Sequence, residues 1–174
     1  MIKNLTLPIS HELAHSLKAG ERVMLSGVVY TARDAAHKRI VKAIEEGEEL
    51  PFDLDCAAVY YAGPCPSKPG QAIGSCGPTT SSRCDPYTPL LIDKGLTVMI
   101  GKGGRSKEVI DKMKGAGTVY LSAIGGAGAL YSTCVISAET VAYPDLGAEA
   151  VRRLTIKNMP AIVATDDCGN NILR

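Results

Sequence analysis

Three basic residues stand where the sequence pattern predicts that a strand ends and a helix begins, namely Arg33, Arg83 and Lys102. Such junctions present free backbone N–H groups and the positive end of a helix dipole at the ligand-binding edge of an open α/β sheet. An arginine fork binds a carboxylate through two parallel hydrogen bonds, so two arginines and a lysine suit both ends of a dicarboxylate. The spacing therefore predicts a site for a small anion.

Hydroxyl and glycine residues adjoin two of these basic residues. Four consecutive hydroxyl side chains, residues 79–82, directly precede Arg83, and glycines 101, 103 and 104 surround Lys102. Hydroxyl groups add hydrogen-bond donors, and glycine lets the backbone approach a ligand closely. Both features favour anion binding at this edge of the sheet.

A plainer interpretation of the same residues stays open. The hydroxyl string can simply cap a helix, and each arginine has an acidic neighbour with which it can pair, Asp34 beside Arg33 and Asp85 close to Arg83. We expect His37 to pack or cap rather than to catalyse. Nucleotide binding is weakly supported, because the glycine-rich segments lack both the Walker A and the G-x-G-x-x-G spacing.

The cysteines show no pattern typical of a metal site. They stand at positions 56, 65, 76, 84, 134 and 168, and no two have a C-x-x-C or other tight ligand spacing. We therefore expect no metal site on this chain and buried thiols in a reducing cytoplasm. The first ten residues also lack the apolar region of a signal peptide.

Alternating strand and helix patterns predict one α/β domain over residues 1–174, with parallel pairing in its central sheet. Strands are expected over residues 5–9, 22–31, 56–62, 96–100, 119–124, 135–141, 152–157 and 161–165. Helices are expected over residues 11–18 (capped by Ser10), 34–46, 85–93 (capped by Asp85), 106–114 (capped by Ser106) and after the glycines at 125–128. These elements place the basic residues at the ends of strands.

Composition excludes several functional classes. Lys plus Arg number 19 against 18 for Asp plus Glu, so the net charge of +1 attracts neither nucleic acid nor an anionic membrane. The chain has no Trp and one Phe, which argues against a base-stacking surface. Residues 119–138 carry no charge, but the glycines inside this segment favour a buried strand, loop and helix over a membrane span.

Six short strings of residues form an ordered set of motifs. They lie at residues 31–38 (TARDAAHK), 60–64 (YYAGP), 77–83 (GPTTSSR), 85–88 (DPYT), 99–103 (MIGKG) and 167–170 (DCGN). Together they resemble one enzyme family, the β subunit of class I, iron–sulfur-dependent fumarate hydratase and its relative L-tartrate dehydratase. The strings cover nearly the whole chain in order, which makes the resemblance far more specific than any single motif.

The resemblance implies a swivelling β/β/α domain of three layers, with a parallel central sheet and a second, smaller sheet. It also implies that a 4Fe-4S cluster is bound by a partner α subunit and not by this chain, and that an open iron of the cluster acts as a Lewis acid. The expected assembly is therefore a cytoplasmic hetero-oligomer, with a homodimer as the alternative for the isolated chain.

The resemblance assigns substrate-carboxylate binding to Arg33, Arg83 and Lys102, and proton transfer at the carbon beside a carboxylate to Thr79. A threonine hydroxyl is a weak base and needs strongly cationic surroundings for such a role. Cys84 stands where the family commonly has Met, a packing change that leaves the clamp intact.

The expected function is therefore that of the β subunit of a hydro-lyase, which hydrates fumarate reversibly to L-malate, a reaction of the citric acid cycle, and is inactive alone. Two alternatives stay open. One is the β subunit of L-tartrate dehydratase, which converts tartrate to oxaloacetate, and the other is a non-catalytic domain for small-anion binding or assembly.

Overall fold

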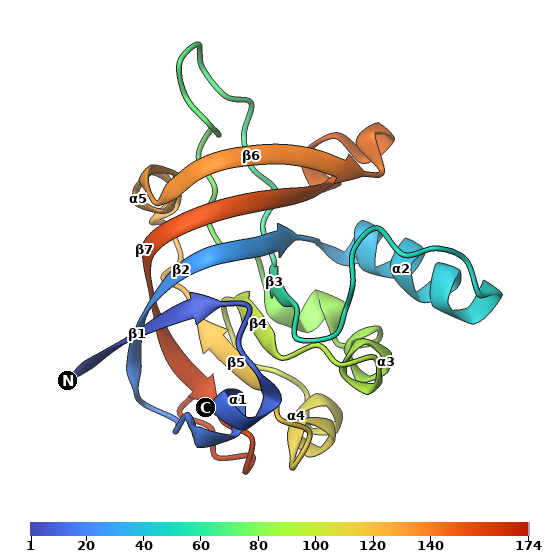
Figure 1. Cartoon of the computed structure of the whole chain (residues 1–174), viewed down its shortest axis with the longest axis vertical. Coiled ribbons are helices and arrows are strands. Elements are labelled where there is room, and N and C mark those ends of the chain that lie inside the picture. The colour runs from blue at the N-terminus through green and yellow to red at the C-terminus, as the bar shows by residue number, and fades with distance from the viewer. Residues whose placement is uncertain (174) are drawn as a thin grey trace.

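Strands and helices alternate along the chain in the computed structural model, which describes residues 1–173 (Figure 1). The strands are β1 (Ile2–Leu7), β2 (Arg22–Thr31), β3 (Ala58–Tyr60), β4 (Val98–Gly101), β5 (Val119–Ser122), β6 (Val135–Ala142) and β7 (Val151–Thr165). The α-helices are α1 (His11–Ser16), α2 (Asp34–Glu46), α3 (Thr88–Asp93), α4 (Lys107–Met113) and α5 (Gly128–Thr133), and the 3₁₀ helices are η1 (Ser81–Cys84) and η2 (Pro144–Glu149).

All seven strands of the described residues form one sheet, in the order β1-β2-β3-β4-β5-β7-β6. The pairs from β1 to β5 are parallel, which confirms the expected α/β class and parallel centre, whereas β7 runs antiparallel to its neighbours. Because β7 pairs with β2 as well as with β5, the sheet curls into a partly closed barrel (Figure 1). The expectation of a second, smaller sheet is therefore wrong for these residues.

The two C-terminal strands expected over residues 152–157 and 161–165 are one continuous strand, β7. Asn158, with a φ of 51°, and Pro160 suggest a turn between them, because both residue types are common in turns. In the structure β2 pairs with β7 on both sides of this point, from Arg22 opposite Ile162 to Thr31 opposite Arg152. This long-range pairing keeps the segment extended.

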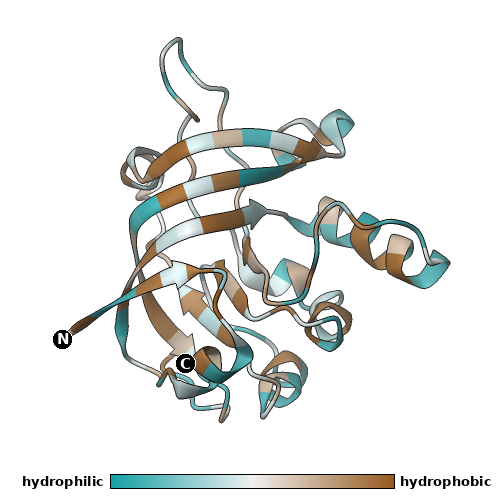
Figure 2. Cartoon of the chain, viewed as in Figure 1, coloured by the Kyte–Doolittle hydropathy of each residue, from teal (hydrophilic) through white to brown (hydrophobic). Residues whose placement is uncertain are grey.

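Apolar side chains pack on both faces of the curled sheet. Alternate residues of the strands, such as Leu25 and Val163, fill the interior of the barrel together with Tyr131 from α5. On the outer face, Met99 and Tyr120 pack under α2, α3 and α4, which Figure 1 shows together on one side. Figure 2 shows the alternation of hydrophobic and hydrophilic residues along β2, β6 and β7 that this packing requires.

Local signals located several helix ends correctly. The Leu13 N–H donates to Ser10 Oγ at 3.2 Å, and the Val109 N–H donates to Ser106 Oγ at 3.3 Å, so both serine caps are confirmed. The cap expected at Asp85 is wrong, because α3 begins only at Thr88. The Asp85 carboxylate instead accepts hydrogen bonds from residues 105 and 106.

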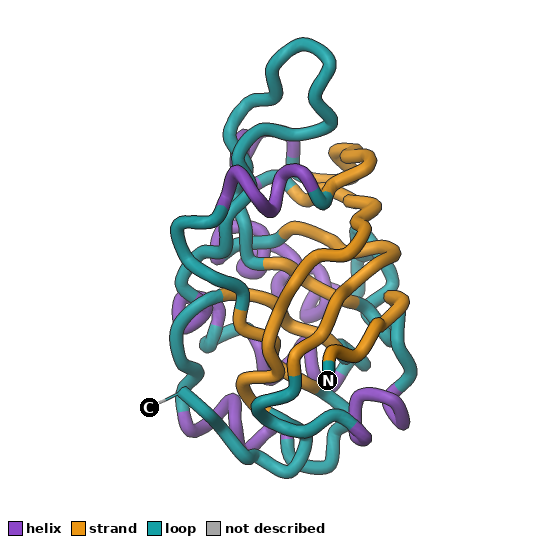
Figure 3. Tube along the Cα trace, turned by 90° about the vertical axis from the view of Figure 1, so that its left-hand side faces the viewer, coloured by secondary structure: helices purple, strands orange, loops and turns teal. Residues whose placement is uncertain are grey.

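A long loop over residues 63–76 projects from the rest of the molecule (Figures 1 and 3). Residues 65–72 at its tip are exposed, whereas the Cys65 N–H donates to Ser75 O at 2.9 Å and closes its base. The uncharged stretch 119–138 forms β5, a loop, α5 and the start of β6, as expected. Within residues 1–173, no helix has the length and apolar character needed to cross a membrane.

Candidate active site

The carboxyl ends of β2, β3 and β4 bring two of the three basic residues to one edge of the sheet. These strands are parallel neighbours, with Thr31 opposite Tyr60 and Tyr60 opposite Ile100. Arg33 follows the end of β2 and Lys102 follows the end of β4. Two strand spacings of about 4.8 Å separate β2 from β4, so the backbones of these residues lie about 10 Å apart if the register continues.

Backbone hydrogen bonds attach Thr79 to the same edge. The Thr79 N–H donates to Tyr61 O at 2.7 Å, directly after β3, and the Lys102 N–H donates to Thr79 O at 3.2 Å. The Ser81 N–H in turn donates to Lys102 O at 3.0 Å. The segment carrying Thr79 therefore lies beside the backbone of Lys102, although the two residues are distant in sequence.

The side chain of Thr79 is half-buried, and its hydroxyl group has a defined partner. Oγ1 donates to the carbonyl oxygen of Tyr61 at 2.9 Å. A carbonyl accepts only, so the hydroxyl proton points to Tyr61 O and the lone pairs of Oγ1 stay available to accept a hydrogen bond. Sequence reasoning identified Thr79 as a candidate but carried no signal for this orientation.

Arg33 is the N-cap residue of α2, and its guanidinium faces two carboxylates. Nη2 lies 3.1 Å from Glu149 Oε1 in η2, and Nε lies 3.9 Å from Asp34 Oδ1. Nε is buried without a hydrogen-bond partner among the described residues. Gly63 lies against the side chain, since a Cβ there would come within 3.0 Å of Nη1. The expected Asp34 contact is thus weak, and Glu149 is a partner that the sequence analysis missed.

The side chains of Arg83 and Lys102 are exposed, and neither side chain makes a hydrogen bond or ion pair with another residue of the described chain. Arg83 lies inside η1 rather than at a strand–helix junction, which corrects its expected position. The expected local pairing of Arg83 with Asp85 is also wrong, because Asp85 binds Arg105 instead. Lys102 lies over Gly125, where a Cβ would be 3.3 Å from Lys102 Cδ. Both cations can therefore engage an anion.

The buried guanidinium of Arg105 is the main feature that the sequence analysis missed. Its Nε donates to Asp85 Oδ1 at 2.6 Å, Nη1 to the hydroxyl of Tyr61 at 3.1 Å, and Nη2 to Thr88 Oγ1 at 2.7 Å. The guanidinium carbon also lies 5.2 Å from the ring centres of Tyr61 and Tyr120. Its side chain is fully buried.

This arginine links the two loops that carry the candidate ligand residues. Asp85 follows η1 directly, and its Oδ2 accepts the N–H of Ser106 at 2.7 Å at the start of α4. The pair of Arg105 and Asp85 therefore holds η1, with Arg83, next to the loop of Lys102. Because a buried charge needs a close partner, this pairing is strongly specified.

His37 is fully buried on α2 and packs, as expected. Its Nδ1 donates to the carbonyl oxygen of Arg33 at 2.8 Å, and its ring meets the ring of Tyr61 edge-on at 5.3 Å between centres. Burial lowers the pKa of His37 from near 6.5 to about 4. The neutral ring therefore supports the backbone that carries Arg33.

The cysteines of the described chain do not fit an iron–sulfur cluster. All six are free thiols, and no three of them come together within residues 1–173. Cys76 and Cys84 are buried, and burial raises the pKa of each thiol to about 12, which disfavours the thiolate that a cluster requires.

The sequence matches the family model described as Fumarase C-terminus over residues 2–174. The chain belongs to this family. It is 41% identical over 155 residues to Fumarate hydratase 2 of Leishmania major and 39% identical over 155 residues to the aerobic class I fumarate hydratase of Escherichia coli. Each alignment covers 88% of this chain but only 27% and 28% of the relative, so the chain spans about a quarter of these enzymes.

One relative has nearly the same extent as this chain. A protein of Methanocaldococcus jannaschii named as a putative L(+)-tartrate dehydratase subunit beta is 41% identical over 162 residues, which cover 90% of this chain and 83% of that protein. These matches confirm the family that the sequence motifs indicated, and the relatives include proteins named as fumarate hydratases and one named as a putative tartrate dehydratase subunit. The roles of Arg33, Thr79, Arg83 and Lys102 stay predictions.

Proposed function

We propose that this chain supplies the dicarboxylate clamp and the proton-transfer residue of a hydro-lyase that interconverts fumarate and L-malate. One observation carries the proposal. The backbone segments of Thr79 and Lys102 are hydrogen-bonded to each other at one sheet edge, and the exposed cations of Arg83 and Lys102 lack partners within the described chain. This arrangement suits a substrate that carries two carboxylates.

The cations act on charge that develops during the reaction. Removal of a proton from the carbon beside a carboxylate moves negative charge onto that carboxylate, and Arg33, Arg83 and Lys102 stabilise it. In the dehydration direction, Thr79 Oγ1, ionised to the alkoxide beside these cations, accepts the carbon-bound proton and becomes a neutral hydroxyl. The hydroxyl group on the neighbouring carbon takes a proton from solvent and leaves as water. In the hydration direction, the same proton returns to carbon.

A partner chain completes the site in this proposal and holds the 4Fe-4S cluster, which supplies Lewis-acid chemistry when bound. Two findings support the division. The fumarate hydratase relatives are several times longer than this chain, and one relative of similar extent is named as a beta subunit. The dispersed cysteines of this chain agree with cluster ligands that lie elsewhere.

The test is an anaerobic assay of fumarate loss. It is run with this chain alone, with this chain assembled with an α chain that co-purifies with it, and with the same assembly carrying a variant of this chain. Activity is expected only in the assembled pair. Arg83→Ala and Lys102→Ala should each cost about 2 to 5 kcal/mol of transition-state stabilisation, seen in kcat/KM, because each removes a charge-assisted contact. Arg153→Ala, an exposed arginine at another place in the fold, is the matched control.

Three outcomes separate this proposal from its alternatives. Turnover of tartrate without turnover of malate would assign the chain to the tartrate dehydratases, an alternative that the name of the Methanocaldococcus relative supports. Dicarboxylate binding without turnover of either compound in a cluster-loaded pair would favour a non-catalytic anion-binding domain. Unchanged kinetics in Arg83→Ala would remove Arg83 from the site.

A further inference from the structure

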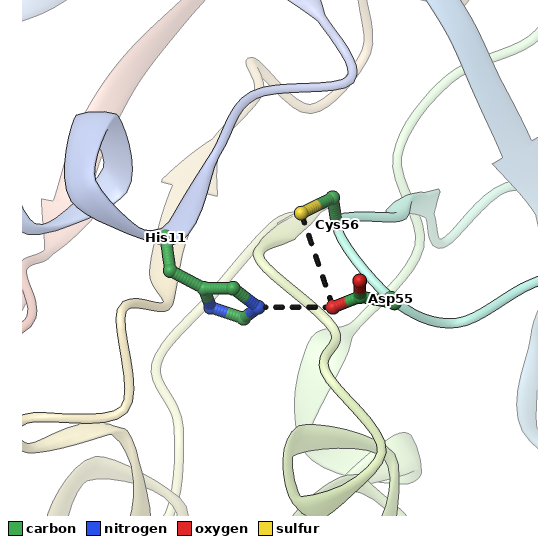
Figure 4. A group of neighbouring side chains, drawn as sticks. All are labelled: His11, Asp55 and Cys56. Atoms are coloured by element: carbon green, nitrogen blue, oxygen red, sulfur yellow. Dashed lines mark hydrogen bonds and ion pairs between the residues drawn. The ribbon is translucent and has the colours of Figure 1, made fainter.

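Three metal-ligating side chains meet at the opposite end of the parallel strands from the candidate active site. They are His11, the first residue of α1, and Asp55 and Cys56, which precede β3 (Figure 4). One ligand atom from each lies within 4.8 Å of the other two. We propose that these residues bind a divalent transition metal ion of the zinc class, with water in the remaining position.

The orientation of the His11 ring carries the inference. Nδ1 lies 3.2 Å from both Ala116 O and Gly117 O, and since carbonyls only accept, Nδ1 must carry the proton. Nε2 faces the Asp55 carboxylate at 3.2 Å, and either a proton on Nε2 or a cation bound between the two atoms satisfies this contact. The proposed ion takes the place of that proton. Metal-binding histidines commonly fix their other nitrogen on a backbone carbonyl in this way.

The distances suit a shared tetrahedral ion. Zinc bonds of about 2.0 Å to nitrogen and oxygen, at a tetrahedral angle, place those two atoms about 3.3 Å apart. The distance from His11 Nε2 to Asp55 Oδ1 is 3.2 Å, and that from Cys56 Sγ to Asp55 Oδ1 is 3.9 Å. Figure 4 shows the imidazole and the thiol directed toward the same carboxylate oxygen.

Rigid backbone contacts hold the ligands in place. A Cβ at Gly117 would come within 2.6 Å of His11 Cβ, and a Cβ at Gly95 would come within 2.7 Å of Asp55 Oδ1. The Cys56 N–H donates to Gly95 O at 2.9 Å. Glycine at both positions therefore allows the ligand-bearing segments to pack directly against two loops.

Charge and access also favour a cation. Asp55 is exposed, and Asp53 accepts the Asp55 N–H at 2.9 Å, so two carboxylates lie beside the thiol. The ion would join α1 to the segment before β3, which gives it a structural role separate from the candidate active site.

The experiment measures binding of zinc ion alone to the full chain after treatment with a chelator. Titration calorimetry should give one ion per chain, and cobalt in place of zinc should give a thiolate-to-metal charge-transfer band. Cys56→Gly should weaken zinc binding at least about tenfold and remove the band. Because Cys56 has a φ of 59°, glycine suits its backbone and the variant should fold.

Two further variants complete the test. Cys65→Ser removes an exposed thiol in the projecting loop and should leave zinc binding unchanged. Asp55→Asn alters an exposed side chain and should weaken binding about tenfold, which decides the matter if Cys56→Gly fails to fold. Zinc binding that is absent in the wild-type chain, equal in Cys56→Gly, or lost in Cys65→Ser would overturn the proposal.

Discussion

At the scale of single residues, the arrangement of the candidate site depends on the buried pair of Arg105 and Asp85. Arg105 has a fully buried side chain, and Asp85 is only 10% exposed, so neither charge has an adequate alternative partner in water. The two exposed basic residues that the pair positions, Arg83 and Lys102, contribute little to stability by the same reasoning. The structural cation, Arg105, is thus distinct from the two candidate ligand-binding cations, Arg83 and Lys102.

We predict that Arg105→Met destabilises the chain by about 3 to 5 kcal/mol, because it leaves the carboxylate of Asp85 buried without its cation. The free energy of unfolding from urea titration measures this loss. Arg83→Ala is the matched control and should change the free energy by less than about 0.5 kcal/mol, because Arg83 is exposed. Similar losses in the two variants would contradict the structural role of Arg105.

His37 predicts a specific pH dependence of stability. Its folded-state pKa of about 4 lies below the usual value near 6.5, so the unfolded chain binds more protons between these values. The contribution of neutral His37 to stability is therefore complete above about pH 6.5 and is lost as the pH falls toward 4. In this window the wild-type chain should lose about 1.4 kcal/mol per pH unit more than His37→Gln.

Urea titrations at a series of pH values measure this difference. His11 and His15 are present in both proteins, so their titration cancels in the comparison. Parallel profiles for the wild-type chain and His37→Gln would show that the pKa of His37 is the same in the folded and unfolded chain, which would contradict the lowering attributed to its burial.

At the scale of elements, the contact between the end of β4 and η1 determines where Lys102 lies. Gly101 is the last residue of β4, and a Cβ there would lie 2.1 Å from Ser81 Oγ and 2.8 Å from Tyr61 Cδ2. Ser81 Oγ is itself held at 2.8 Å from the Tyr120 hydroxyl. The glycine is therefore required by close packing between two elements.

We predict that Gly101→Ala destabilises the chain by about 1 to 3 kcal/mol, because the added methyl group forces these elements apart. Gly104→Ala, in the same loop, is the control, since a Cβ there meets nothing within 4 Å. It should change the free energy of unfolding by less than about 0.5 kcal/mol. If both substitutions were neutral in thermal and urea unfolding, the close contact at Gly101 would be refuted.

At the scale of the whole molecule, the projecting loop contrasts with the closed sheet. Residues 65–72 are exposed, whereas β4 lies in the middle of the sheet and is fully buried. The base of the loop is fixed by the Cys65 N–H to Ser75 O bond and by Gly74, where a Cβ would lie 2.4 Å from Cys65 O, and within the tip the Gln71 N–H donates to Lys68 O at 3.0 Å. The exposed tip is open to contact by another chain.

We predict that the amides of the non-proline residues between positions 66 and 72 exchange hydrogen rapidly in the isolated chain, while those of β4 and β5 exchange only on global unfolding. Assembly with the proposed α chain should slow exchange in the loop at least about tenfold. Hydrogen exchange followed by mass spectrometry, with and without the α chain, measures both effects. If hydrogen exchange in the loop stayed unchanged in an active assembly, the loop would not be part of the interface with the α chain.

The sequence by itself determined the elements whose signals are local. The strand Arg22–Thr31 and the helix Asp34–Glu46 have the expected bounds, and Ser10 and Ser106 cap the expected helices. Side-chain periodicity and capping act within a few residues, which is why they can be read without the fold. The ordered motifs also indicated the family that the comparison over residues 2–174 confirmed.

Only the tertiary structure decided the long-range pairings. Four features join segments that are separate in sequence. They are the unbroken strand β7, the pairing of Arg33 with Glu149, the Arg105–Asp85 pair, and the contact of His11 with Asp55, 44 positions away. A buried polar group takes whichever partner the sheet register brings near, and nearby residues in the sequence do not specify that register. The local sequence pattern therefore located the candidate ligand residues, but the strand pairing of the curled sheet determined which residues surround them.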